Sequence, residues 1–164
     1  MTAHLTILGG GSIGCFLGFA LAGPTLHVTV LSRPPIAALA AAGSMAVFKL
    51  DGERLSRSPN LQLVDSMDAL PERTDGVLVT TKVHDLAAVV SAWMARAPTL
   101  DVPIWGLQNG LRSHAVLAEI GVRDPRAGSV TFNVVRSRER WTQTTSGALL
   151  LPAHPGCRVT GSIH

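Results

Sequence analysis

The sequence predicts an α/β fold in which helices cover a doubly wound, mostly parallel sheet with a small antiparallel addition. Three observations predict it. Short apolar runs alternate with helical stretches, which is typical of βαβ units with right-handed crossovers. The length of 164 residues suits one domain with its own core. Hydrophobic residues make up 46% of the chain and charged residues 15%, a composition that excludes intrinsic disorder.

The first four elements follow one another with clear boundaries. Leu5–Leu8 is an apolar run that stops at a glycine cluster, as a buried parallel strand does. Apolar residues at helical spacing predict a helix over Ser12–Ala22, which Gly23-Pro24 ends. Leu26–Leu31 is expected to be the second strand, and the alanine-rich stretch Ile36–Ala42 the second helix.

A hairpin and a third strand occupy the middle of the chain. Asp51-Gly52 lies between the extended segments of Met45–Leu55, and this dipeptide favours a tight turn in which both central residues have positive φ. Asn60–Val64 is expected to be the third strand of the parallel sheet. Ser66–Leu70 forms at most a short helix.

The second half returns to alternating strands and helices. Gly76–Thr81 is the most hydrophobic of the predicted strands, and Val83–Ala97 follows it as a helix with one apolar side. Val102–Leu107 predicts a fifth strand and Leu111–Ile120 its helix. Gly128–Val135 is expected to be the sixth strand.

The end of the chain is expected to leave the parallel sheet. Trp141–Thr145 and Ala148–Leu151 are predicted to pair with each other as a terminal antiparallel unit. Residues 152–164 show no clear period and are interpreted as a linker or a truncated end. The α/β domain is therefore expected to span residues 1–151.

A glycine-rich turn joins the first predicted strand to the first helix. Its residues fit G-x-G-x-x-G in the strand–turn–helix context that gives the pattern meaning: Gly9, Gly10, Gly11, Ser12, Ile13 and Gly14. The first glycine allows the sharp turn, the second lets backbone N–H groups approach a diphosphate, and the third lets the helix pack closely. The helix N-terminus adds partial positive charge. The motif favours a Rossmann-like, dinucleotide-binding domain; its alternative is a glycine-rich turn without a ligand.

The end of the second strand indicates which dinucleotide would bind. An NAD site usually has an acidic residue there for the ribose 2′-hydroxyl, whereas an arginine accommodates a 2′-phosphate. Ser32 and Arg33 occupy this place, and no carboxylate stands near them in the sequence, since the first acidic residue is Asp51. Arg33 can hold a phosphate through two parallel hydrogen bonds. The residues therefore favour NADP(H); the alternative is that Arg33 is a solvated loop residue.

Two later loops carry polar residues at the carboxyl ends of strands, where an open α/β sheet has its ligand crevice. Thr81 and Lys82 follow the fourth strand, and Asn109 follows the fifth. A lysine and an asparagine at these points could orient a substrate carboxylate or carbonyl beside a nicotinamide. Position alone leaves two alternatives open: Lys82 as a solvated helix start, and Asn109-Gly110 as a plain turn.

Together these segments resemble the ketopantoate reductase (2-dehydropantoate 2-reductase) family, within the 6-phosphogluconate-dehydrogenase-like oxidoreductases. The resemblance is carried, in the family's order and spacing, by Ile7–Gly14, Leu31–Arg33, Val79–Lys82 and Gln108–Leu111. It implies NADPH-dependent reduction of a 2-keto acid, ketopantoate to pantoate, in pantothenate and coenzyme A biosynthesis. By this resemblance Arg33 binds the 2′-phosphate, and Lys82 and Asn109 are the catalytic-site residues that line the junction of nicotinamide and substrate.

The family continues into a second, mostly helical domain that supplies a proton-donating lysine and a substrate-binding glutamate. No residue of this chain matches either. The chain is therefore expected to be the cofactor-binding half, with the C-terminal helical domain absent and little activity alone. Its expected partners are a small 2-keto acid and either a separate helical domain or a second copy of itself. A catalytically incompetent nucleotide-binding fragment is the alternative.

Other classes of protein fit the residues less well. S-adenosylmethionine-dependent methyltransferases usually have an acidic residue where this chain has Arg33. Scattered basic residues and 4% aromatic content disfavour nucleic-acid binding. Glycines interrupt the charge-free stretch Leu5–Ser32, which disfavours a membrane span. The histidines lack metal-ligand spacing and the two cysteines form no C-x-x-C pair, so a reduced, cytoplasmic protein without a metal site is expected.

Overall fold

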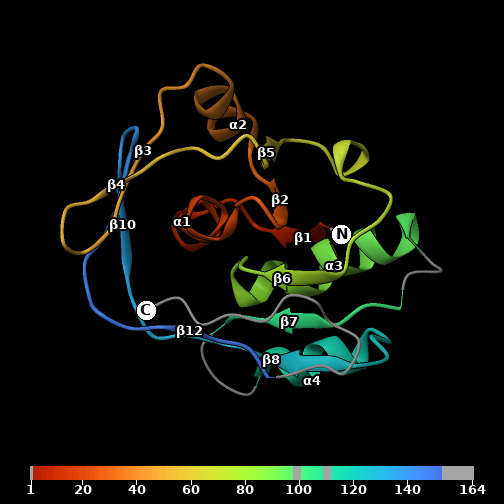
Figure 1. Ribbon diagram of the computed structural model, residues 1–164. Helices are drawn as coiled ribbons and strands as arrows, with labels where there is room; N and C mark the ends of the chain where they lie inside the picture. The colour runs from red at the N-terminus through yellow and green to blue at the C-terminus, as the bar shows by residue number, and fades with distance from the viewer. Residues whose placement is uncertain (1, 98–100, 109–111, 153–164) are drawn as a thin grey trace.

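The computed structural model describes residues 2–97, 101–108 and 112–152. Its principal sheet has six strands in the order β5-β2-β1-β6-β7-β8, and all neighbouring pairs are parallel (Figure 1). The strands are β1 (Ala3–Leu8), β2 (Leu26–Leu31), β5 (Leu61–Val64), β6 (Gly76–Val79), β7 (Ile104–Gly106) and β8 (Pro125–Ala127). The chain steps outward twice from the central first strand and then crosses to its other side. This order is that of a doubly wound Rossmann-like sheet, so the predicted fold class is confirmed.

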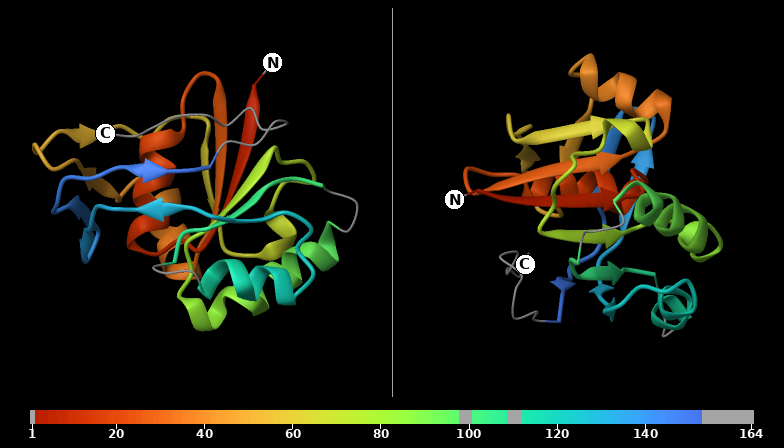
Figure 2. Two further views of the ribbon diagram at one scale, coloured as in Figure 1. Left: turned by 90° about the horizontal axis from the view of Figure 1, so that it is seen from below. Right: turned by 90° about the vertical axis from the view of Figure 1, so that its right-hand side faces the viewer.

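Helices cover both faces of this sheet (Figures 1 and 2). The helices are α1 (Ser12–Leu21), α2 (Pro34–Ala41), α3 (Val83–Arg96) and α4 (Arg112–Glu119), with a short 3₁₀ turn η1 (Met67–Ala69). Pro34 and Pro35 are the first residues of α2, which therefore begins two residues before the predicted start, because proline's fixed φ suits the first helical turn. No helix in these described ranges is both long and apolar enough to cross a membrane.

Successive residues of the central strands face opposite sides of the sheet and divide the core into two clusters. Leu5 and Ile7 of β1 pack with α1 and α2, whereas Leu8 packs with α3 and α4. Trp105 belongs to the first cluster and Trp93 to the second, and both are fully buried. Because both faces are covered, the central strands β1, β2, β6 and β7 are mostly apolar, which is why short apolar runs predicted these four strands.

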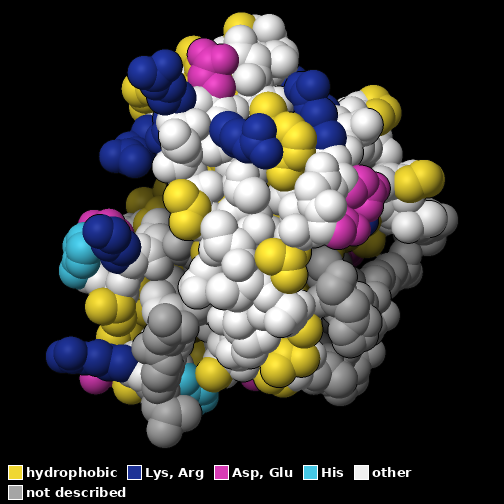
Figure 3. Space-filling model, turned by 90° about the vertical axis from the view of Figure 1, so that its left-hand side faces the viewer, with side chains coloured by type: hydrophobic (Ala, Val, Ile, Leu, Met, Phe, Trp, Pro, Cys, Tyr) yellow, Lys and Arg dark blue, Asp and Glu magenta, His cyan; other side chains and the backbone are white. Residues whose placement is uncertain are grey.

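A second, smaller sheet packs against α1 and has the strand order β10-β11-β3-β4. Its strands are β3 (Ala46–Phe48), β4 (Arg54–Leu55), β10 (Val134–Ser137) and β11 (Arg140–Gln143). Trp141 of β11 is fully buried in the cluster around α1. The guanidinium of Arg140 lies 3.9 Å from the Phe48 ring centroid. On the face that Figure 3 shows, most of the Lys and Arg side chains lie in the upper half, with hydrophobic and acidic groups among them.

Two strand predictions in the last third of the chain are wrong. The sixth parallel strand is β8 rather than Gly128–Val135, whose residues fall into β9 (Ser129–Val130) and the start of β10. Trp141–Thr145 does not pair with Ala148–Leu151: β11 pairs with β10 and β3, and β12 (Leu149–Leu150) pairs with β9. Proline is unfavourable in most strands, so the sequence around Pro125 does not predict one. However, β8 is an edge strand, where the missing N–H of proline is tolerated.

The predicted hairpin at Asp51-Gly52 is confirmed, but its turn differs from the prediction. Gly52 has φ +88°, and among the described non-glycine residues only Arg138 has a positive φ. The Gly52 N–H donates to the Lys49 carbonyl at 3.1 Å, and the Lys49 N–H donates to the Glu53 carbonyl at 2.8 Å. These bonds close a three-residue loop in which glycine alone takes the left-handed conformation.

Candidate dinucleotide site

The loop between β1 and α1 is held against the end of β2 by its own backbone. The N–H groups of Gly9 and Gly10 both donate to the Leu31 carbonyl, at 3.2 and 2.7 Å. Gly9 has φ +123°, a conformation that side-chain-bearing residues rarely adopt. A Cβ at Gly10 would collide with the Cβ of Ser32. Glycine is therefore required at both positions for the sharp turn beside β2.

The same loop is fastened to β6 and to the first turn of α1. The Thr80 hydroxyl donates to the Gly9 carbonyl at 2.5 Å. A Cβ at Gly14 would collide with that carbonyl oxygen and lie 2.7 Å from the Thr80 hydroxyl. Gly14 therefore allows α1 to approach the strands closely, in the role predicted for the third glycine.

Gly11 is the one glycine of the motif whose absent side chain leaves open space. It is the N-cap of α1, and a Cβ there would meet no protein atom within 4 Å. The first N–H groups of a helix have no acceptor within the helix, and they carry the positive end of its dipole. The loop therefore fits a diphosphate, whose oxygens would accept from these groups where a side chain would otherwise stand.

A cavity of about 650 Å³ runs along this loop and the ends of four neighbouring strands. Gly9, Gly10 and Gly11 line its middle, and Ser32 and Arg33 follow β2. Thr80, Thr81 and Lys82 follow β6. The parallel strands thus bring segments that lie about 70 residues apart in the sequence, such as Gly9 and Lys82, to one edge of the sheet, as the sequence predicts for its ligand crevice.

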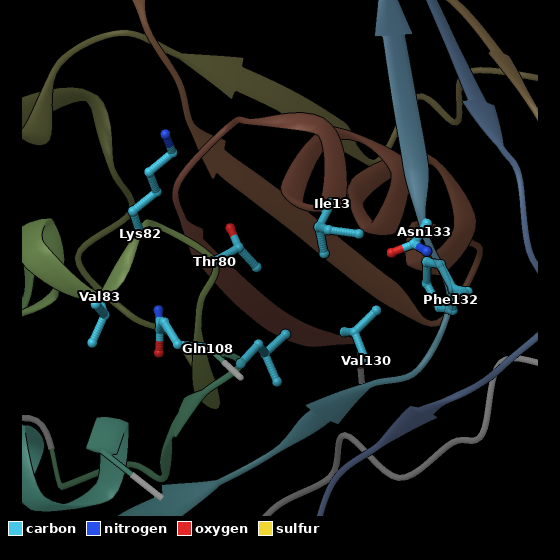
Figure 4. Close-up of a pocket in the computed structure, with 9 residues that line it drawn as sticks. Ile13, Thr80, Lys82, Val83, Gln108, Val130, Phe132 and Asn133 are labelled. Carbon is cyan, nitrogen blue, oxygen red and sulfur yellow. The ribbon is translucent and has the colours of Figure 1, made fainter. Parts of the chain in front are cut away.

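A second cavity of about 370 Å³ adjoins the first, because Thr80 and Lys82 line both. Figure 4 shows Thr80, Lys82 and Gln108 on one side of it and Val130, Phe132 and Asn133 on the other, with Ile13 between them. Lys82 is the N-cap of α3 and makes no ion pair with the described residues. A cationic side chain thus stands at the junction of the two cavities.

Gln108 fixes the loop that carries Lys82. Its side-chain amide nitrogen donates to the Val79 carbonyl at 3.1 Å and to the Thr81 carbonyl at 2.8 Å. It therefore ties the end of β7 to the end of β6. Its amide oxygen is buried and accepts no hydrogen bond from the described residues.

The structure brings most of the predicted site residues together. Seven line the larger cavity: Gly9, Gly10, Gly11, Ser32, Arg33, Thr81 and Lys82. Ser12, Ile13 and Gly14 form the first turn of α1, and Ile13 lines the smaller cavity. Asn109 lies outside the described residues. Among the residues described, no group of three His, Cys, Asp or Glu side chains could hold a metal ion.

Sequence reasoning missed two carboxylates of the larger cavity, Asp65 and Asp85. No carboxylate stands near Arg33 in the sequence, but in the structure Asp65 lines the same cavity as Arg33. Asp65 directly follows β5, which pairs with β2 in parallel. In the sequence, Asp65 directly follows the predicted strand Asn60–Val64. This position indicates a site residue only once it is known that this strand lies beside the second strand in the sheet.

Cys15, in the first turns of α1, is expected to be chemically inert in the folded protein. Its thiol donates to the Gly10 carbonyl at 3.3 Å, and burial raises its pKa to about 12, against a smaller lowering by the charge of Arg136. Thiolate is the reactive form. In a Cys157→Ser background, a disulfide reagent at pH 8 should therefore label the unfolded chain rapidly and the native chain hardly at all; rapid native labelling would contradict the buried thiol.

The same pKa difference makes stability depend on alkaline pH. The unfolded thiol ionises near its ordinary pKa of about 8.5, whereas the folded thiol stays protonated up to about pH 12. The stabilisation is therefore fully present below about pH 8.5 and is lost as the pH rises towards 12. Relative to Cys15→Ala, the free energy of unfolding measured in urea should fall by about 1–2 kcal/mol between pH 7 and pH 10.

The fold and the glycine loop define a Rossmann-like α/β domain of the kind that oxidoreductases use. Residues 5–156 match the family described as ketopantoate reductase PanE/ApbA. The chain belongs to this family, which confirms the resemblance found in the sequence and favours an oxidoreductase over a methyltransferase. A search of curated protein sequences finds no match.

Solved structures of similar fold come from the same family and from other dehydrogenases. The 2-dehydropantoate 2-reductase of Methylococcus capsulatus is 24% identical with a TM-score of 0.68, over 89% of this chain and 47% of that one. The Geobacter metallireducens enzyme of the same name is 22% identical with a TM-score of 0.68, over 93% and 51%. D-mandelate dehydrogenase with NADH and anilino(oxo)acetate is 14% identical with a TM-score of 0.71, over 89% and 47%. The chain spans about half the length of these proteins.

Proposed function

We propose that this chain is the NADP(H)-binding half of a reductase that converts a 2-keto acid to a 2-hydroxy acid, with ketopantoate as the candidate substrate. The observation that carries the proposal is the pair of adjoining cavities that share Thr80 and Lys82. One runs along a glycine loop suited to a diphosphate, and the other is small and mixed in polarity. Family membership and the dehydrogenases of similar fold support the same reaction class.

The residues of the larger cavity fit each part of the dinucleotide. The backbone N–H groups at Gly11 and the start of α1 would hold the diphosphate, and Arg33 would hold the 2′-phosphate. Thr80 and Lys82 would lie at the nicotinamide end, where the cavities meet. When bound, the cofactor supplies the hydride.

The residues of the smaller cavity would bind and orient the keto acid. The ammonium of Lys82 would attract its carboxylate, and Gln108 would hold the Lys82 loop in place through its two backbone hydrogen bonds. Ile13, Val130 and Phe132 offer apolar contact and exclude water. The group that protonates the ketone oxygen is proposed to come from a helical domain, either in a separate chain or in a longer protein, because this chain spans half the length of its structural relatives.

Titration with NADPH and NADH tests the proposal. Arg33→Ala removes a charge-assisted hydrogen bond to phosphate, so NADPH affinity should fall by about 10- to 100-fold while NADH affinity changes less than about threefold. Arg73→Ala, an exposed arginine that does not line the cavity, is the matched control and should change neither affinity. Equal affinity of the unmodified chain for both nucleotides would contradict the preference for NADP(H), and binding of neither would contradict the dinucleotide site.

A further inference from the structure

The adenosine end of the larger cavity carries two opposite charges on neighbouring strands. β2 and β5 are parallel, with Leu31 opposite Val64. Just beyond this pair, the Ser32 N–H donates to the Val64 carbonyl at 2.7 Å and the Ser32 hydroxyl donates to it at 3.3 Å. Arg33 and Asp65 follow at once, so the two strand ends present a cation and a carboxylate to the same cavity.

These two charges remain available to a ligand. Both residues are exposed, and neither takes part in an ion pair among the described residues. If Arg33 and Asp65 formed an ion pair with each other, Asp65 would only orient the arginine. Because they form no such pair, each side chain can interact with a bound ribose independently.

The two forms of the adenosine ribose differ in what they require from such a pair. A 2′-hydroxyl donates one hydrogen bond, for which a carboxylate is a good acceptor. A 2′-phosphate is strongly anionic, so it is attracted by the guanidinium and repelled by the carboxylate. An arginine without a nearby carboxylate would bind the 2′-phosphorylated ribose much more tightly than the 2′-hydroxyl form. A carboxylate beside the arginine reduces this difference in affinity.

We infer that Asp65 is a specificity-determining residue, which weakens binding of the 2′-phosphate and accepts a hydrogen bond from a 2′-hydroxyl. The chain then binds both NADP(H) and NAD(H). Arg33 raises the affinity for NADP(H), and Asp65 lowers it, so the preference for NADP(H) is modest. The inference rests on the proposed dinucleotide site. It concerns a residue outside the glycine motif and outside the end of β2, where specificity is usually sought.

Calorimetric titration of the unmodified chain and of Asp65→Asn with NADPH and NADH tests the inference. Loss of the carboxylate should raise NADPH affinity about 3- to 10-fold, because a repulsion is removed. It should lower NADH affinity about 2- to 10-fold, because an acceptor is weakened. Asp68→Asn is the matched control: it removes the same charge three residues further on, from an exposed residue that does not line the cavity.

The outcomes separate the inference from the proposed function. An NADPH-to-NADH affinity ratio that rises about 6-fold or more in Asp65→Asn but not in Asp68→Asn supports the inference. A smaller rise in Asp65→Asn, or an equal rise in Asp68→Asn, overturns it while the dinucleotide site stands. Failure of the unmodified chain to bind either nucleotide overturns the proposed function, and the inference with it.

Discussion

Replacement of Gly11 by aspartate is expected to abolish dinucleotide binding while the protein stays folded. Gly11 lines the cavity, and a side chain there would enter space that no protein atom occupies within 4 Å. Its φ of −82° suits any residue, and aspartate is among the best helix N-caps, so stability should be unchanged or slightly higher. The new carboxylate would occupy the place of the diphosphate and repel it. NADPH affinity should therefore fall by at least about 100-fold.

Gly11→Asn is the matched control, because asparagine has the same shape and also caps helices well. It should weaken NADPH binding less than aspartate does, and the difference between the two variants measures the effect of charge. Thermal unfolding followed by circular dichroism checks that both variants fold. If the folded aspartate variant bound NADPH within about threefold of the unmodified chain, the diphosphate would not lie at this loop.

The places of the glycine loop and of Arg33 along one cavity could be predicted because they depend on neighbours in the sequence. A turn that directly joins a strand to a helix can be predicted from nearby residues alone. Here the spacing of Gly9, Gly11 and Gly14 was sufficient. The apolar strands of the main sheet could be predicted for a similar reason. Because such strands are buried on both faces, they form continuous apolar runs, and the prediction does not need to assign each residue to a face of the sheet.

The features that were missed depend on pairing between distant segments. β11 lies beside β3, whose residues come about 90 positions earlier, so no local pattern around Trp141 indicates its partner. Asp65 enters the site only because β5 neighbours β2. β8 begins with Pro125, which local rules reject and an edge position tolerates. The pairing of β11, the position of Asp65 and the strand β8 all depend on the order of strands in the sheets, which local sequence patterns do not indicate.

Gly14→Ala is expected to destabilise the protein although alanine is the better helix former. Alanine within α1 should gain about 1 kcal/mol over glycine from helix propensity. Its Cβ, however, would collide with the Gly9 carbonyl oxygen and crowd the Thr80 hydroxyl. The carbonyl belongs to a backbone that is bonded to both β2 and β6, so it cannot move without disturbing those bonds. The overpacking should outweigh the gain, and the free energy of unfolding in urea should fall by about 1–3 kcal/mol.

Gly18→Ala distinguishes this clash from a general intolerance of alanine in α1. The propensity gain is the same, but a Cβ at Gly18 would meet only side-chain ends, the Val30 Cγ2 at 2.8 Å and the Leu61 Cδ1 at 3.1 Å. These methyl groups can shift without breaking a backbone hydrogen bond, although the buried Val30 side chain is stiff, so Gly18→Ala should lose less stability than Gly14→Ala. Displacement of the Gly9 carbonyl should also weaken NADPH binding in Gly14→Ala only. Equal stability and equal affinity of the two variants would mean that α1 does not need glycine for its close approach to the strands.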